Sequence, residues 1–247
     1  MSGLMRTAAF LVASLLLPAA SARAAEPVDL LLVLSVDVSR SIDHPKFLLQ
    51  RDGYAAAIAD PHVIDAIKSG PLGKIGLAFM EWSGFGAQKI VIDWTLIDGE
   101  ASARKFGDRV VEAPRSFADR TAISGAIDFS AAMFPKAPYE ATRRTIDISG
   151  DGTNNAGRSV EVARDMAVAQ GIAINGLVIL SDNSPPWNQE HTNPPGGLAK
   201  YYEDNVIGGP GAFVMVAEDF QSFGRAIVKK MIAEIAMYQV APHILVR

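Results

Sequence analysis

The sequence predicts an α/β fold: a doubly wound, mostly parallel sheet flanked by helices on both faces, with one antiparallel edge strand. Three observations predict this class. Residues 28–36 are almost continuously apolar, as expected of a central strand buried on both faces. Short β-rich apolar runs then alternate with longer segments of helical period, an order that implies parallel strands joined by helices. A short turn-like link at residues 83–88 favours an antiparallel strand pair, expected at a sheet edge.

The individual elements follow in chain order. Strands are expected at short, β-rich apolar runs, at residues 28–36, 74–82, 89–96, 144–149, 172–180 and 212–216. Helices are expected where apolar side chains recur at helical spacing, at residues 45–59, 100–112, 124–134, 159–170 and 219–237. Because ligands of such sheets bind at the carboxyl ends of the strands, functional side chains should directly follow strands.

The first 24 residues resemble a secretory signal peptide. Arg6 precedes an uncharged apolar run at residues 8–18, and Ala22-Arg23-Ala24 has the small-x-small pattern that precedes cleavage. The run is too short for a permanent membrane span, although an uncleaved anchor or a buried helix remains an alternative. We therefore expect a signal peptide at 1–24, a single domain at 25–247 and a periplasmic or secreted product.

Composition narrows the class of partner. The formal net charge of −4 comes without basic clusters, so nucleic acid and anionic membrane surfaces are poor candidates. The absence of cysteine excludes disulfides, thiolate metal sites and a lipid-modified cysteine at the cleavage point. No later apolar run reaches spanning length, so we expect no membrane span after signal cleavage.

Polar residues directly follow the first strand, at Asp37, Ser39 and Ser41. Their alternation can aim one carboxylate and two hydroxyls into the same small volume. All three are hard oxygen donors, which suit Mg²⁺, Ca²⁺ or Mn²⁺. Taken alone, the triplet is equally compatible with an ordinary turn or a helix cap.

Two later residues extend this pattern. Thr121 stands just before the helix at 124–134, where it could also serve as an N-cap. Asp151 lies between two glycines after the strand at 144–149, where a carboxylate has close backbone access but could also belong to a turn. Both should reach the same edge of a parallel sheet as Asp37.

These segments together resemble the metal-ion-dependent adhesion site of the von Willebrand A domains, which include the integrin inserted domains. Asp37, Ser39, Ser41, Thr121 and Asp151 match its three parts in the family's order. The resemblance covers residues 28–236. Within the superfamily, the sequence most resembles an uncharacterised family of exported bacterial proteins. One departure is Gly150, where many relatives have threonine.

The resemblance implies a specific chemistry. Ser39 and Ser41 would coordinate an ion directly, Thr121 directly or through water, and Asp37 and Asp151 would supply charge, one or both through water. The open position would accept a carboxylate from a partner protein or peptide. Mg²⁺ fits best because it prefers octahedral geometry and keeps waters, with Ca²⁺ or Mn²⁺ as alternatives.

The surroundings of this site supply further candidates. Arg40, Asn154 and Asn155 flank the proposed ion and could contact a ligand, although each could be an ordinary turn or surface residue. The long connection at residues 181–211, which contains Trp187, begins at the same edge. It could form a wall of the binding face or a lid packed on its own aromatics. The four histidines show no paired-histidine metal spacing.

The sequence therefore favours an exported binding module that holds a partner carboxylate through a divalent ion. The alternatives are a metal-assisted hydrolase and a degenerate structural domain without metal. The chain has no G-x-S-x-G elbow, paired-histidine metal motif or phosphate-binding loop, so we do not expect an enzyme.

Overall fold

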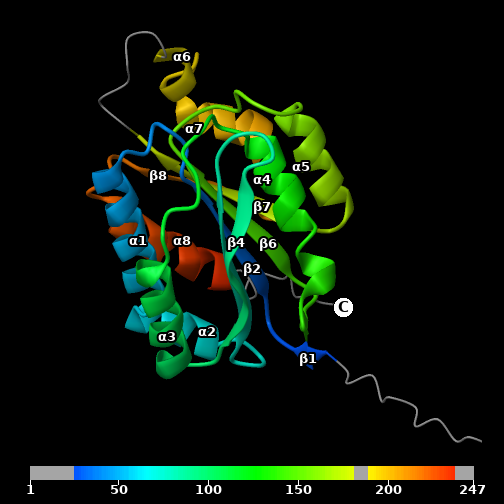
Figure 1. Ribbon diagram of the computed structural model, residues 1–247. Helices are drawn as coiled ribbons and strands as arrows, with labels where there is room; N and C mark the ends of the chain where they lie inside the picture. The colour runs from blue at the N-terminus through cyan, green and yellow to red at the C-terminus, as the bar shows by residue number, and fades with distance from the viewer. Residues whose placement is uncertain (1–24, 181–188, 237–247) are drawn as a thin grey trace, which may run out of the picture.

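The computed structural model describes residues 25–180 and 189–236, and its centre is a six-stranded sheet in the order β4-β3-β2-β6-β7-β8 (Figure 1). The strands are β2 (Leu31–Asp37), β3 (Ile75–Trp82), β4 (Gln88–Ile97), β6 (Arg144–Gly150), β7 (Ala173–Ile179) and β8 (Val214–Ala217). Every pairing is parallel except β3 with β4, and β4 lies at the edge. The predicted fold class is confirmed.

The central strand β2 explains the layered core. All of its residues are buried, and they alternate between the two faces of the sheet as strand geometry requires. Leu32 and Leu34 belong to one apolar cluster, and Leu31 and Val33 belong to the other. The continuous apolar run in the sequence therefore reflects burial on both sides.

Helices cover both faces of this sheet (Figure 1). The first cluster is covered by α1 (His44–Ile58), α2 (Pro61–Lys68), α3 (Glu100–Glu112) and α8 (Phe223–Ala236). The second is covered by α4 (Ile123–Ala131) and α5 (Val160–Ala169). In the described ranges, no helix is long and apolar enough to span a membrane.

Several predicted boundaries were wrong for local reasons. The final helix begins at Phe223 rather than at 219, because Asp219 Oδ1 accepts a hydrogen bond from Ser222 N (2.6 Å) in a preceding turn. The helix predicted at 124–134 ends at Ala131, and a short 3₁₀ turn, η1 (Phe134–Lys136), follows. The sequence analysis missed α2 and a two-stranded parallel pair, β1 (Glu26–Pro27) with β5 (Tyr139–Glu140).

The described part of the connection after β7, residues 189–211, contains regular structure. It contains α6 (Gln189–Thr192), α7 (Leu198–Tyr201) and a π-helical turn, η3 (Tyr202–Val206). The predicted signal peptide at 1–24 and Trp187 lie outside the described residues.

Candidate metal centre

The carboxyl ends of β2, β3 and β6 meet at one edge of the sheet. Asp37, the last residue of β2, pairs with Trp82 at the end of β3, and Val36 pairs with Ser149 near the end of β6. Asp151 directly follows β6, and α4 starts at the same edge, because Ala122 N donates to Ser83 O (2.8 Å) after β3. The parallel topology thus places the predicted residues together.

Four of the five predicted ligands form one hydrogen-bonded chain. Ser39 N donates to Asp37 Oδ1 (2.7 Å), and Ser41 Oγ donates to Asp151 Oδ1 (2.6 Å). Ser39 Oγ and Ser41 Oγ lie 3.1 Å apart. Because the single proton of Ser41 is directed to Asp151, Ser39 is the donor between the two hydroxyls.

The two carboxyl groups of this chain are almost completely buried. Asp37 is 0% exposed and Asp151 is 1% exposed. Burial raises the pKa of Asp37 well above its ordinary value, and the charge of Asp151 raises it further. Burial also raises the pKa of Asp151, while the hydrogen bond from Ser41 opposes the rise.

Each carboxyl group also has one oxygen that the described residues leave without a hydrogen bond, Oδ2 of Asp37 and Oδ2 of Asp151. No lysine or arginine of the described ranges forms an ion pair with either group. Buried carboxylate oxygens without a partner are costly, and a divalent cation would relieve that cost. The donor set therefore fits a hard divalent ion.

Arg115 fixes the turn that carries the two serines. Its guanidinium donates to Val38 O (2.6 Å) and Ser39 O (2.9 Å). Arg115 is distant from the 37–41 segment in sequence, and its contacts with the main chain hold that segment in place. The sequence analysis did not single out Arg115, because no motif links it to the turn.

Thr121, the fifth predicted ligand, is buried and does not cap a helix. The N-cap of α4 is Ala122, without a side-chain hydrogen bond. Thr121 N donates to Asn155 Oδ1 (2.9 Å), and Thr121 Oγ1 lies 3.2 Å from His191 Nε2. The capping alternative for Thr121 is therefore wrong.

The predicted ligand-contacting residues have mixed positions. Asn154 Oδ1 accepts from Ser124 N (3.0 Å), so Asn154 and Asn155 join the segment after β6 to the start of α4. Arg40 is exposed, its main-chain N donates to Asp119 O (2.9 Å), and its side chain has no ion pair in the described ranges. Of these candidates, Arg40 alone presents an exposed cation.

The sequence analysis missed His191, which belongs to α6 in the long connection. Its side chain is only 6% exposed, and burial lowers its pKa. Nδ1 lies 3.1 Å from Thr153 Oγ1 and 3.4 Å from Asn155 Nδ2, and His191 O accepts from Thr153 N (2.8 Å). The described part of the connection therefore borders the candidate centre, on the side of Thr121.

Two glycines allow this close approach. A Cβ on Gly152 would lie 2.2 Å from His191 Nε2, so a side chain there would displace the imidazole. A Cβ on Gly150 would lie 2.6 Å from the hydroxyl of Tyr202 and 3.1 Å from Asp37 Oδ2. The departure at Gly150 from the threonine of many relatives thus makes room for Tyr202, which is fully buried.

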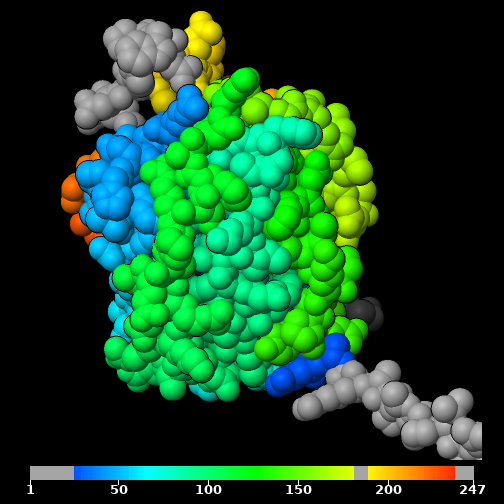
Figure 2. Space-filling view, viewed as in Figure 1, coloured from blue at the N-terminus to red at the C-terminus, as the bar shows by residue number. Residues whose placement is uncertain are grey.

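The surface around the centre is formed by segments distant in sequence. Figure 2 shows the β3–β4 turn beside the segment that precedes α4 at the upper edge of the molecule. Phe85, in that turn, is 80% exposed, and a Cβ on Gly157 would lie 3.6 Å from its ring. An exposed aromatic side chain thus lies next to the segment that holds Asn154 and Asn155.

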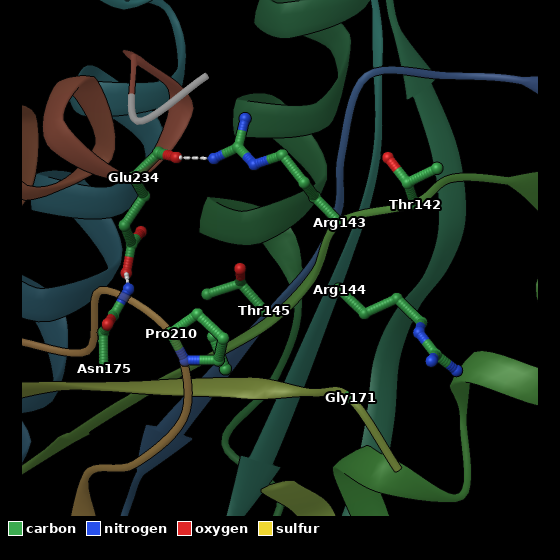
Figure 3. Close-up of a pocket in the computed structure, with 9 residues that line it drawn as sticks. Thr142, Arg143, Arg144, Thr145, Gly171, Asn175, Pro210 and Glu234 are labelled. Carbon is green, nitrogen blue, oxygen red and sulfur yellow. Dashed lines mark hydrogen bonds between the residues drawn. The ribbon is translucent and has the colours of Figure 1, made fainter. Parts of the chain in front are cut away.

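A separate cavity of about 140 Å³ opens at the opposite edge of the sheet, beside the first residues of β6 and β7 (Figure 3). Arg143 donates to the main-chain oxygens of Glu234 and Ile235, and Arg144 donates to Gln170 O (2.6 Å). Both guanidinium groups therefore satisfy carbonyls at helix ends. No predicted site residue lines this cavity.

Comparison with known proteins agrees with the fold. The model of a family described as "Protein of unknown function (DUF1194)" matches residues 27–239. A search of curated proteins finds no match.

Solved structures share the fold at low sequence identity. Proximal thread matrix protein 1 from the mussel byssus, with a zinc-occupied MIDAS motif, has a TM-score of 0.58 and 14% identity, over 85% of this chain and 49% of that chain. Pilus adhesin SpaC from Lactobacillus rhamnosus GG has a TM-score of 0.60 and 11% identity, over 85% of this chain and 30% of that chain. The von Willebrand factor type A structure from Catenulispora acidiphila has a TM-score of 0.52 and 15% identity, over 84% of this chain and 43% of that chain. The predicted von Willebrand A fold is confirmed, and the chain spans less than half the length of these proteins.

Proposed function

We propose that this chain, which belongs to the DUF1194 family and has the fold of a von Willebrand A domain, is an exported, metal-dependent protein-binding module. It would hold a carboxylate of a partner protein or peptide through a divalent ion bound by Asp37, Ser39, Ser41, Thr121 and Asp151. One observation carries this proposal: two buried carboxyl groups share one site, and each has an oxygen without a hydrogen bond in the described chain.

The chain's own residues explain how such a site would work. Ser39 and Ser41 present neutral hydroxyls that already lie 3.1 Å apart, and Thr121 presents a third. Asp37 and Asp151 would balance the charge of the ion, one or both of them through water. A bound divalent ion with a mostly neutral inner shell would remain electrophilic and could accept a partner carboxylate.

The donor chemistry limits the choice of ion. Hydroxyl and carboxylate oxygens suit Mg²⁺, Ca²⁺ and Mn²⁺, and Mg²⁺ fits an octahedral site that keeps waters. The zinc-occupied motif of the mussel protein supports a divalent ion at this place in the fold. Within the described ranges, no group of three or more histidine, cysteine or acidic side chains could hold an ion, so the serine and threonine hydroxyls are essential to the proposal.

The rim of the centre supports an acidic partner. The exposed Arg40 lies inside the Asp37–Ser41 turn and has no ion pair with the described residues. The exposed ring of Phe85 offers an apolar contact at the same edge. The similarity to a pilus adhesin is consistent with a role in protein binding. Nucleic acid is not proposed, because the chain is acidic.

A metal-assisted hydrolase is the alternative, and the contact between Thr121 Oγ1 and His191 Nε2 (3.2 Å) is the observation that favours it. However, both side chains are buried, and Nδ1 of His191 faces a hydroxyl and an amide rather than a carboxylate that would raise its basicity. We therefore propose a binding function and no enzymatic one.

A peptide-capture experiment tests the proposal. The full chain is immobilised and exposed to peptides with glutamate or aspartate, beside matched peptides with glutamine or asparagine, in Mg²⁺ or in EDTA. We expect capture of acidic peptides only, and only with Mg²⁺. Capture that persists in EDTA, or that ignores the amide replacement, would contradict the proposal. Turnover in a hydrolase screen would support the alternative.

A further inference from the structure

We infer that Arg115 and Lys46 are positioning residues that make the metal centre prefer Mg²⁺ over Ca²⁺. They hold main-chain carbonyl oxygens of the 37–41 segment in hydrogen bonds, so that those oxygens do not bind the ion. This inference rests on the proposed function, because it concerns the same ion. It goes beyond the motif, since neither residue belongs to the motif or is expected to touch the ion.

Arg115 binds two carbonyl groups of the segment. Its Nη2 atom donates to Val38 O (2.6 Å) and to Ser39 O (2.9 Å). Ser39 O also accepts a hydrogen bond from Ile42 N (3.1 Å), so both of its lone pairs are used. The carbonyl of the first motif serine and the carbonyl of the residue before it are therefore both engaged.

Lys46 binds a third carbonyl group of the segment. Its Nζ atom donates to Ser41 O (3.1 Å) and lies 4.9 Å from the centre of the Phe220 ring. The hydroxyl of Ser41 donates to Asp151, and it also lies next to the hydroxyl of Ser39. On each of the two serines, the carbonyl oxygen is therefore bonded to a cation, whereas the hydroxyl contacts another side chain of the centre.

Arg115 is itself fixed by the surrounding structure. Its Nε atom donates to Phe117 O (2.8 Å), and its guanidinium carbon lies 5.6 Å from the centre of the Phe47 ring in α1. The next residue, Ser116, donates its main-chain N–H to Oε2 of the fully buried Glu81 (2.9 Å). The hydrogen bonds to the segment therefore come from a side chain that is anchored to the core.

Engaged carbonyls favour the smaller ion. Ca²⁺ takes about six to eight oxygen ligands at about 2.3–2.6 Å, and main-chain carbonyls are among its usual donors. Mg²⁺ demands near-ideal octahedral geometry at about 2.0–2.1 Å and keeps several waters. With three carbonyls bonded elsewhere, hydroxyls and carboxylates remain as donors. These suffice for Mg²⁺ with its waters but limit the coordination of Ca²⁺.

The charges of the two cations do not by themselves select between the ions. Mg²⁺ and Ca²⁺ carry the same charge, so a nearby guanidinium or ammonium group weakens the binding of both by a similar factor. The ratio of the two affinities therefore separates the effect of the hydrogen bonds from the effect of charge.

The test is a calorimetric titration of the full chain with Mg²⁺ and with Ca²⁺, repeated on Arg115→Met, Arg115→Lys and Lys46→Met. We expect Arg115→Met to lower the ratio of Mg²⁺ to Ca²⁺ affinity by about tenfold, the lower end of the losses caused by removing partners of metal ligands. Lys46→Met releases one carbonyl and should lower the ratio by about threefold. Arg115→Lys keeps the charge but loses the planar guanidinium, so it should resemble Arg115→Met.

Arg104→Met is the matched control. Arg104 is exposed and pairs with Glu100 in α3, which follows β4 at the opposite edge of the sheet, so the ratio should not change. Circular dichroism checks that the variants fold. A ratio that stays unchanged in either test residue's methionine variant would overturn the assignment of that residue, even if both affinities fall together.

The same titrations distinguish the two proposals. If the unaltered chain binds neither ion, the proposed function fails and the inference fails with it. If Asp37→Asn abolishes Mg²⁺ binding while Arg115→Met and Lys46→Met leave the ratio unchanged, the inference alone fails.

Discussion

Two pairs of buried acidic side chains in this molecule differ in where their positive charge comes from. Asp147 in β6 and Glu234 in α8 share Lys230, whose Nζ lies 2.7 Å from Asp147 Oδ1 and 2.5 Å from Glu234 Oε1. Asn175 Nδ2 also donates to Glu234 Oε1 (2.9 Å). All three charged side chains are buried. Here the chain supplies its own cation.

The other pair, Asp37 and Asp151, lies at the carboxyl edge of the same sheet without an ion pair from the described residues. Ser41 Oγ donates to Asp151, and the charges of Lys46 and Arg115 lower the pKa of Asp151 and of Asp37, respectively. The inner pair is compensated within the protein, whereas we propose that the edge pair is compensated by a cation from solution.

The largest expected effect comes from removing the inner cation. Lys230→Met leaves two buried carboxyl groups without their ammonium partner, and we expect the free energy of unfolding to fall by about 3–5 kcal/mol. Urea unfolding measures it. Lys229→Met, at the exposed neighbouring position, should change stability by less than about 0.5 kcal/mol. A loss below about 1 kcal/mol for Lys230→Met would mean that Lys230 does not compensate the pair.

Substitution in the edge pair should raise the stability of the metal-free protein, whereas Lys230→Met lowers stability. Asp37→Asn removes a buried charge, so the metal-free protein should gain about 1 kcal/mol of stability. Mg²⁺ at about 100 times its dissociation constant should stabilise the unaltered chain by about 2.7 kcal/mol and Asp37→Asn not at all. Thermal unfolding with Mg²⁺ or EDTA checks both parts, and a variant that Mg²⁺ still stabilises would contradict the assignment.

The inner pair also predicts a dependence of stability on pH. Burial raises the pKa of Asp147 to about 7 from an ordinary value of 3.8, with Glu234 adding to the rise and Lys230 opposing it. The folded state therefore holds a proton that the unfolded state has lost, so this contribution is complete below pH 3.8 and disappears as pH rises to about 7. In EDTA, Asp147→Asn should flatten the decline in unfolding free energy over this range. An unchanged pH profile would contradict the shift.

The smallest expected effect concerns the rim of the edge site. Phe85→Ala removes an exposed ring and should weaken acidic-peptide capture by about fivefold, equivalent to about 1 kcal/mol, without changing Mg²⁺ affinity. Leu72→Ala alters a side chain that is also exposed but precedes β3 at the opposite edge, and it should leave capture unchanged. Equal effects of the two substitutions would remove Phe85 from the binding face.

The grouping of Asp37 and Asp151 at one edge was predictable because both residues come at the ends of strands. Asp37 directly ends a strand whose apolar run is unmistakable, and Asp151 follows the next strand over in the sheet. Parallel topology alone then brings them together. The same reasoning could have found α2, since Asp60 and Pro61 form a recognisable helix start that the sequence analysis overlooked.

Other contacts could not be predicted from spacing. His191 and Tyr202 reach the site through the folding of a long connection, and no periodic pattern determines where such a segment packs. Lys230 and Glu234 fall on the buried side of α8, where a helical pattern gives no sign that their partner is Asp147 in a strand far away in sequence. Which side chains from distant elements contact one another is determined by the tertiary structure, not by the spacing of residues in the sequence.

The most direct test of the account is a calorimetric titration of Mg²⁺ into the metal-free chain, beside Asp37→Asn and Asp151→Asn. The account predicts binding at one site in the unaltered chain and its loss in both variants, because both carboxyl groups of the edge pair balance the same ion. Uptake that survives either substitution, or no uptake by the unaltered chain, would contradict it.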